Sequence, residues 1–166
     1  MGDTKNLSHT DAAKKIKELA VEIQTCMFCT YHGSKLESRP MSTQQVDAEG
    51  NIWFLSDKNS KKNKAIATNH SVELFYSQGH DKYLSIHGKA TISYDKEKIK
   101  ELWAPVAKIW FTDGVDDPNI SVIKVSFSDG YYWDNKHGKM AELATMAVAF
   151  VTGKTMDDGI EGKLKK

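Results

Sequence analysis

The stretch FLSDKNSKKNKAIATN, residues 54–69, decides the fold prediction because it joins an apolar segment directly to a cluster of four lysines. The residues NIWFLS, 51–56, are almost continuously apolar, which predicts a buried strand. Ser60 is a favoured helix N-cap and predicts a short helix after it. Lys61 and Lys62 then fall in the first helical turn, where the dipole favours anions over cations. The local pattern alone favours a solvated loop; a bound anion is the alternative.

A second cationic residue comes before this stretch. Arg39 stands at the start of a strand predicted over residues 40–46. If this strand pairs with residues 51–56 as a hairpin, Arg39 reaches the sheet edge where Lys61 and Lys62 begin the helix. Three cations that converge on one corner weaken the interpretation as a solvated loop and strengthen the alternative of a bound anion.

The remainder of the chain reads mainly as short strands separated by turns. An N-terminal helix is predicted over residues 9–24 from its apolar spacing, and Ser8 and Asp11 have the spacing of a capping box before it. Strands joined by tight turns without β-α-β alternation predict an α+β chain, mainly β, with an antiparallel sheet or barrel. The other predicted strands are 26–31, 72–77, 84–92, 120–127 and 130–134, and the other helices are 61–67, 97–103 and about 139–151.

Length and composition describe one globular domain. The 166 residues predict a domain over residues 8–153, between an N-terminal tail, 1–7, and a charged C-terminal tail, 154–166. A net charge of +1 gives no general reason to expect nucleic acid or a membrane surface as partner. The polar N-terminus lacks the apolar core of a signal peptide, so we expect a cytoplasmic protein.

Two further patterns have simple structural interpretations. Cys26 and Cys29 form a C-x-x-C, but they fall in a predicted strand, so we interpret them as structural cysteines. The six histidines show no metal-ligand spacing, and no metal site is predicted. His87 falls on the polar face of the strand 84–92; a surface or cavity residue is the simpler interpretation, and a catalytic base the alternative.

Four segments, taken in order, resemble the pyridoxamine 5'-phosphate oxidase-like flavoproteins. They are SRPMST (38–43), WFLSDKNSKKNKAI (53–66), ELWAPVAKIWFTDGVDDPNISVIKV (101–125) and YYWDNKHGKM (131–140). The tryptophan-rich segments are similar to the family's general stress protein branch, and the likeness covers about residues 8–140. It implies a six-stranded antiparallel split β-barrel, the FMN-binding split barrel, with flanking helices. It also implies a homodimer with FMN at the subunit interface.

The resemblance implies a set of FMN contacts, carried over position by position. The phosphate would be held by Arg39, Lys61 and Lys62, with Ser60 adding a contact at the helix start. Trp133 matches a family tryptophan near the flavin that the partner subunit often contributes. The residues implied to line the isoalloxazine ring are Met41, Ser42, Thr43, Phe54, Leu55 and Ser56.

Two departures from the family bear on function. Lys61-Lys62 stands where the oxidases often have Arg-Lys, which keeps the charge and loses the bidentate fork. The C-terminal segment that contacts substrate in true pyridoxamine phosphate oxidases is not matched, so the resemblance implies the cofactor and not that substrate. The prediction is an FMN-dependent oxidoreductase linked to stress response, with substrate and catalytic residues unknown. The alternatives are a non-catalytic protein for FMN storage or sensing, and a split barrel that binds FAD, a deazaflavin or haem.

Overall fold

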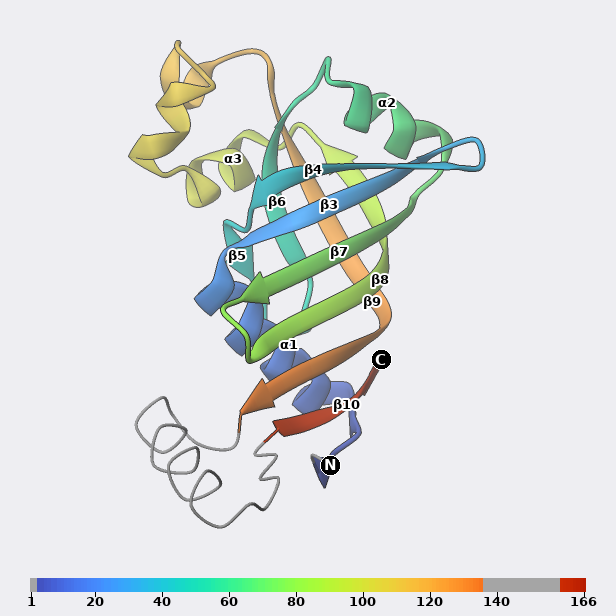
Figure 1. Cartoon of the computed structure of the whole chain (residues 1–166). Coiled ribbons are helices and arrows are strands. Elements are labelled where there is room, and N and C mark those ends of the chain that lie inside the picture. The colour runs from blue at the N-terminus through green and yellow to red at the C-terminus, as the bar shows by residue number, and fades with distance from the viewer. Residues whose placement is uncertain (1–2, 136–158) are drawn as a thin grey trace.

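The structure, a computed structural model, describes residues 3–135 and 159–166. Its strands form one curved sheet that does not close, and helix α1 lies against the sheet's inner face (Figure 1). This mainly β arrangement confirms the predicted fold class, a split barrel with flanking helices. No helix in the described part of the chain is long and apolar enough to cross a membrane.

The elements follow one another with short connections. The helices are α1 (His9–Ile23), α2 (Lys61–Thr68) and α3 (Lys96–Leu102), with 3-10 turns η1 (Pro105–Ile109) and η2 (Gly114–Asp116). The strands are β1 (Asp3–Thr4), β2 (Leu7–Ser8), β3 (Thr25–His32), β4 (Lys35–Ser42), β5 (Gln45–Val46), β6 (Ile52–Asp57), β7 (Ser71–Gln78), β8 (Lys82–Ser93), β9 (Ile120–Asn135) and β10 (Gly159–Lys165). The sheet therefore has 10 described strands instead of the six expected, because three are two-residue pairings and β10 was not predicted.

The strand order leaves the barrel open between β4 and β6. The main path is β1-β10-β9-β8-β7-β3-β4, and β6 joins the sheet through β9. Among the described residues β4 pairs only with β3, and beyond Trp53 strand β6 pairs only with β9. One hydrogen bond, from the Gln44 amide to the Trp53 carbonyl at 2.9 Å, closes one end of this seam.

The hairpin expected from the sequence is wrong in its pairing. Strand β4 pairs with β3 instead of β6, and only Gln45 and Val46 continue onto β6. The physical reason is the turn His32-Gly33-Ser34-Lys35, where Gly33 has φ +60° and folds β4 directly back on β3. The segment predicted as one strand, 40–46, is accordingly divided between two neighbours.

Strand β9 also differs from the prediction. The sequence predicts two strands with a turn at Ser128-Asp129-Gly130, whereas Ile120–Asn135 is one strand. Its pairing with β8 shifts between His87 and Gly88, so Ser128 is an extra residue accommodated as a β-bulge. Turn-forming residues are tolerated there because β8 pairs with β9 on both sides of the bulge.

The chain ends take part in the sheet. Strand β10 pairs antiparallel with β9 and parallel with β1 and β2, and Leu164 is fully buried. The expected charged tail is therefore wrong for Gly159–Lys165. The expected capping box is also wrong, because Ser8 is the α1 N-cap without a side-chain hydrogen bond. The helix predicted near 139–151 lies outside the described residues.

The core forms between α1 and the inner face of the sheet. Ile16 and Leu19 of α1 are fully buried there. The rings of Phe28 and Phe54 meet edge to face with centroids 5.2 Å apart, which joins β3 to β6 across the barrel interior. A second apolar cluster lies under α3 and is centred on Ile99.

Cys26 and Cys29 give a test of this packing, because both are free and buried. Burial raises the pKa of the Cys26 thiol to about 12 and also raises the pKa of Cys29. Both side chains therefore remain thiols at about pH 8, where an ordinary cysteine begins to form thiolate. We expect iodoacetamide to leave the native chain unmodified and to label both cysteines in guanidinium, as measured by intact mass. Native labelling as fast as in the unfolded chain would contradict the packing.

Candidate functional site

Ser60 is the N-cap of helix α2, as predicted. The Ser60 hydroxyl accepts the Asn63 amide at 3.3 Å and donates to the Asn63 side-chain oxygen at 3.1 Å. The first turn of α2 contains no acidic residue to balance its dipole. The N-terminal end of α2 therefore presents free amide groups and lysines together.

Asn63 fixes this helix to the sheet, and sequence reasoning missed it. Its side-chain oxygen accepts the Ser56 hydroxyl at 2.7 Å, and its side-chain nitrogen donates to the Ser121 hydroxyl at 2.8 Å. All three side chains are buried, so each polar atom needs these partners. An Asn three residues after a helix N-cap, following a strand that ends in Ser, is the only sequence signal, and it is weak.

The two lysines of α2 point to different surroundings. Successive helical residues are separated by about 100°. Lys61 is exposed and borders a hollow of about 630 Å³ between α2 and the β3–β4 turn, together with His32 and Lys64. Lys62 is half-buried and lies within electrostatic range of Arg39.

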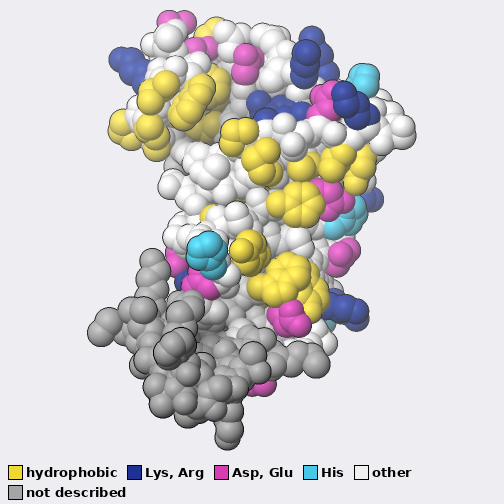
Figure 2. Space-filling model, in the orientation of Figure 1, with side chains coloured by type: hydrophobic (Ala, Val, Ile, Leu, Met, Phe, Trp, Pro, Cys, Tyr) yellow, Lys and Arg dark blue, Asp and Glu magenta, His cyan; other side chains and the backbone are white. Residues whose placement is uncertain are grey.

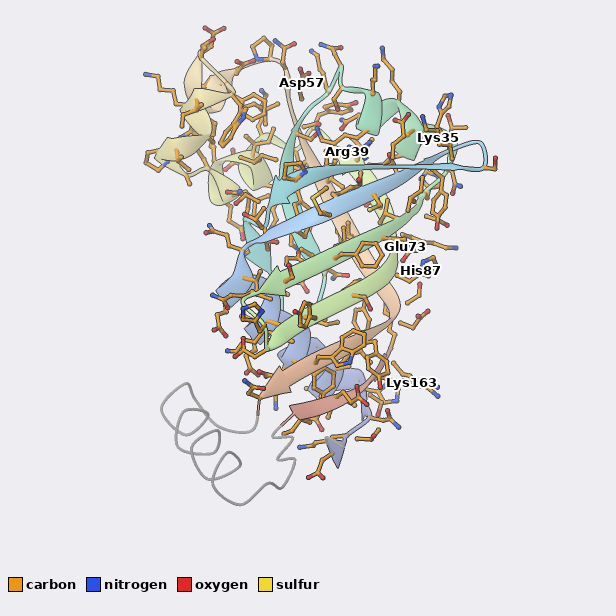
Figure 3. The ribbon with its side chains drawn as sticks, in the orientation of Figure 1. Lys35, Arg39, Asp57, Glu73, His87 and Lys163 are labelled. Atoms are coloured by element: carbon orange, nitrogen blue, oxygen red, sulfur yellow. The ribbon has the colours of Figure 1, made fainter. Side chains whose placement is uncertain are left out.

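Arg39 is fixed by strand β3. Its guanidinium donates to the Thr30 hydroxyl at 2.8 Å and to the Phe28 carbonyl at 3.3 Å, and lies 3.8 Å from the Glu37 carboxylate. Burial lowers its pKa, which Glu37 and Cys29 oppose. Figure 3 shows Arg39 on β4 at the end of the molecule where Asp57 and α2 lie. Arg39 thus reaches the predicted corner through the β3–β4 pair instead of the predicted hairpin.

Lys62 is a half-buried cation close to a second cation, Arg39. Burial lowers the pKa of its ammonium group and the charge of Arg39 lowers it further, while Asp57 acts in the opposite direction. Within residues 3–135 and 159–166, Lys62 makes no hydrogen bond or salt bridge that would offset this desolvation. A bound anion would favour the charged form and relieve the repulsion from Arg39.

The residues predicted to line a flavin ring border the open seam, but several side chains are already engaged. Phe54 is fully buried in the core, and the Thr43 hydroxyl shares a 2.7 Å hydrogen bond with that of Tyr76. The Ser56 hydroxyl donates a hydrogen bond to the Asn63 side chain, and Leu55 packs on the apolar cluster under α3. These positions, with buried Met41 and half-buried Ser42, offer chiefly backbone groups to the seam.

Trp133 lies far from the lysine corner along the sheet. It stands near the C-terminal end of β9, paired with Tyr83 and Glu161, whereas Ile120 at the other end pairs with Asp57. At about 3.3 Å per residue, the stretch from Ile120 to Trp133 follows about 40 Å of strand. Figure 1 shows the two ends of β9 at opposite ends of the molecule. The structure therefore brings together Arg39, Lys62 and the start of α2, but not Trp133.

Comparison with known proteins identifies the family. A model of the family described as pyridoxamine 5'-phosphate oxidase like matches residues 11–157. The chain belongs to this family. Its fold matches a structure described as general stress protein 26 from Jannaschia sp. CCS1, with TM-score 0.79 and 26% identity over 94% of this chain and 98% of that one.

Two other relatives bear on function. A structure described as the general stress FMN/FAD binding protein from Xanthomonas citri matches with TM-score 0.65 and 26% identity over 76% of this chain and 90% of that one. Protein bli-3 of Neurospora crassa is 24% identical over 129 residues, 72% of this chain. This alignment spans 62% of the length of Protein bli-3.

Proposed function

We propose that this protein binds FMN, with the phosphate at the corner formed by Arg39, Lys62 and the first turn of α2. The observation that carries the proposal is the half-buried Lys62 near Arg39, which has no direct anionic partner among the described residues. As the first two residues of the helix, Lys61 and Lys62 also have amide groups with no intrahelical acceptor. Ammonium, guanidinium and free amides together match the oxygens of a phosphate dianion.

The contribution of Ser60 is structural in this proposal. Its hydroxyl is engaged with Asn63, and its amide donates to the Asp57 carbonyl at 3.1 Å. Ser60 thereby fixes the direction of the helix start, and the phosphate contacts come from its neighbours. Lys61, which is exposed, adds charge and its backbone amide.

In this proposal the isoalloxazine ring lies along the seam between β4 and β6. Two strand edges that have no strand partner in the described part of the chain supply backbone donors and acceptors, which suit the polar edge of a flavin. The phosphate corner lies where α2 follows β6, at the end of the seam opposite the Gln44–Trp53 hydrogen bond. The chain would bind the cofactor by its phosphate and orient its ring along these edges.

A flavin supplies hydride transfer at its N5 atom, which makes an oxidoreductase the proposed activity. The FMN/FAD binding relative and the family match support the cofactor class. We place the protein in the cytoplasm, where its two free cysteines would remain reduced.

We also propose a homodimer that completes the flavin site. Large hydrophobic side chains are exposed on the outer face of the sheet, and Figure 2 shows such side chains gathered there. Met27, Phe75, Tyr83 and Trp133 are each between 38% and 45% exposed on this face. Since Trp133 lies far from the phosphate corner of its own chain, it can cover a flavin only from a partner subunit.

The phosphate corner is tested by Lys62→Met, which keeps the length of the side chain and removes its charge. A hydrogen bond to a charged group contributes about 1.5–3 kcal/mol, so we expect FMN affinity to fall about 10- to 100-fold. Riboflavin, which lacks the phosphate, should bind the variant and the wild type equally. Fluorescence titration measures both. Lys64→Met, on the same helix but exposed and not adjacent to Arg39, is the matched control and should bind FMN normally. Equal FMN affinity of Lys62→Met and wild type would refute the assignment.

Enzyme and carrier are separated by anaerobic reduction of the FMN-loaded protein. We expect NADH or NADPH to bleach the flavin absorbance in stopped flow, because the seam holds the ring at an open edge of the sheet. A flavin that is reduced by dithionite but by neither nucleotide would indicate a storage or sensing protein instead. If the protein binds FAD more tightly than FMN, its cofactor is FAD and not FMN.

The dimer is tested by light scattering with Trp133→Ala. We expect the loaded wild type to have twice the chain mass of 18.6 kDa. The variant should keep its FMN phosphate contacts but lose flavin affinity and ring fluorescence quenching. A monomeric wild type that binds FMN fully would contradict the shared site.

A further inference from the structure

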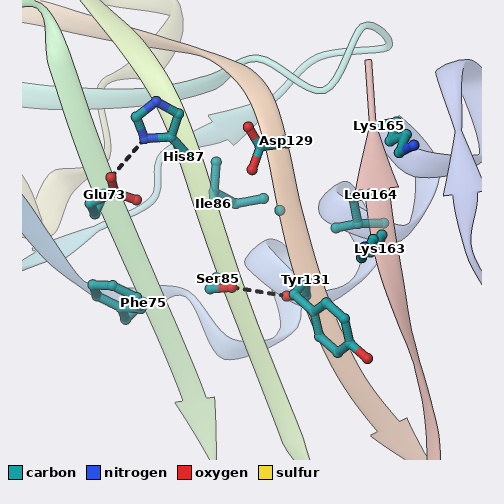
Figure 4. Close-up of a pocket in the computed structure, with 11 residues that line it drawn as sticks. Glu73, Phe75, Ser85, Ile86, His87, Asp129, Tyr131, Lys163, Leu164 and Lys165 are labelled. Carbon is teal, nitrogen blue, oxygen red and sulfur yellow. Dashed lines mark hydrogen bonds and ion pairs between the residues drawn. The ribbon is translucent and has the colours of Figure 1, made fainter.

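A second polar group lies on the outer face of the sheet, away from the phosphate corner. Glu73 of β7, His87 of β8 and Asp129 of β9 occupy one row across three neighbouring strands. Figures 3 and 4 show Glu73 and His87 side by side, and Figure 4 shows Asp129 on the next strand. The β-bulge at Ser128 sets this row, because it shifts the register so that Asp129 stands opposite His87.

The contact with Glu73 fixes which ring nitrogen of His87 carries a hydrogen. One carboxylate oxygen of Glu73 lies 2.6 Å from Nδ1 of His87 and accepts the Tyr31 hydroxyl at 3.2 Å. A carboxylate only accepts, so Nδ1 carries the hydrogen in this contact. The other ring nitrogen, Nε2, has no hydrogen bond within the described residues, and in the neutral imidazole it is an acceptor.

A hollow of about 460 Å³ adjoins this pair (Figure 4). Phe75 and Tyr131 supply aromatic walls, while Glu73, His87 and Asp129 form a polar edge. Lys163 and Lys165 border the hollow from β10, so its two carboxylates are balanced by two ammonium groups. A volume in this range suits a small organic ligand, and the paired charges favour one that is neutral overall.

We propose that this hollow is an acid–base site for a small planar molecule with an ionisable hydroxyl, of the phenol or hydroquinone class. The ring lies against Phe75 and Tyr131, and its hydroxyl donates to Nε2 of His87. The proton then moves from the hydroxyl oxygen to Nε2, leaving a phenolate and an imidazolium. The Nδ1–H remains on Glu73, whose negative charge stabilises the imidazolium, and the lysines of β10 stabilise the phenolate.

Glu73 is a positioning residue in this site. It fixes the tautomer and the direction of the imidazole, as carboxylates do for catalytic histidines. Tyr31 in turn holds the Glu73 oxygen. Loss of the Glu73 charge should therefore reduce proton transfer to His87 more than it reduces occupancy of the hollow.

The hollow is continuous with the proposed dimer surface. Tyr131 lines it and also contacts the Trp133 ring, with centroids 4.5 Å apart. A redox use of the site, in which His87 takes one proton from a hydroquinone and a bound flavin would accept the two electrons and the second proton, rests on the proposed function. Binding and proton transfer in the hollow do not require a flavin.

The test uses p-nitrophenol and the full-length protein without flavin, because the phenolate of this probe absorbs visible light. We expect saturable binding with a larger phenolate fraction than in buffer at the same pH. His87→Gln should abolish the added phenolate absorbance. Glu73→Gln, which keeps the shape of the side chain, should bind the probe and lose most of that absorbance.

The matched control is His80→Gln, an exposed histidine in the β7–β8 turn, which should behave as wild type. A nitrogen-15 NMR spectrum gives a second measurement: the wild type should show His87 protonated at Nδ1, and Glu73→Gln should shift that tautomer. Absence of saturable binding to wild type, or an unchanged phenolate band in a folded His87→Gln, overturns the proposal. If the hollow fails these tests but the protein still binds FMN, the proposed flavin function is retained and only the acid–base site is refuted. If the phenolate band is observed but the protein does not bind FMN, the acid–base site is retained and the proposed flavin function is refuted.

Discussion

Strand β9 pairs with β6 and β8 in its first half and with β8 and β10 in its second. This strand of 16 residues has a strand partner on at least one edge at every position except the bulge at Ser128, and it connects both ends of the sheet. The sheet must curve to follow α1, and the bulge at Ser128 accommodates the change in register. Because β6 pairs with β9 and β4 pairs with β3, β4 and β6 do not pair with each other, and the barrel is open at the seam between them.

The open seam and the lysine corner are two consequences of one arrangement. Helix α2 follows β6, and Asn63 ties it to Ser56 and Ser121 on the two paired strands. This attachment turns Lys62 toward Arg39 and leaves Lys61 in water. Partial burial of two neighbouring cations costs free energy, and a phosphate would offset that cost. The cationic corner would bind the phosphate of FMN, and the edges of β4 and β6 that lack a partner among the described residues would bind its ring. Both features therefore favour the same ligand.

The outer face of the sheet has a different chemistry from the seam. Its exposed aromatic residues suit contact with a second copy, while the Glu73–His87 pair marks a polar hollow within that apolar surface. The Tyr131–Trp133 contact joins the two regions. A flavin at the seam and a proton-transfer group on the outer face can meet only if another subunit brings the two faces together, which links assembly to catalysis in this proposal.

The sequence by itself determined the elements whose signals are local: α1 from its apolar period, α2 from the Ser60 cap, and the family from segments such as SRPMST. It also predicted Arg39 near Lys62, although by an incorrect hairpin. Tertiary structure alone decided the single strand β9 and the inclusion of Gly159–Lys165 as β10. It alone placed Asn63 between two serines and Asp129 beside His87. These features depend on pairing partners distant in the chain and on a one-residue bulge, and local residue preferences do not encode either.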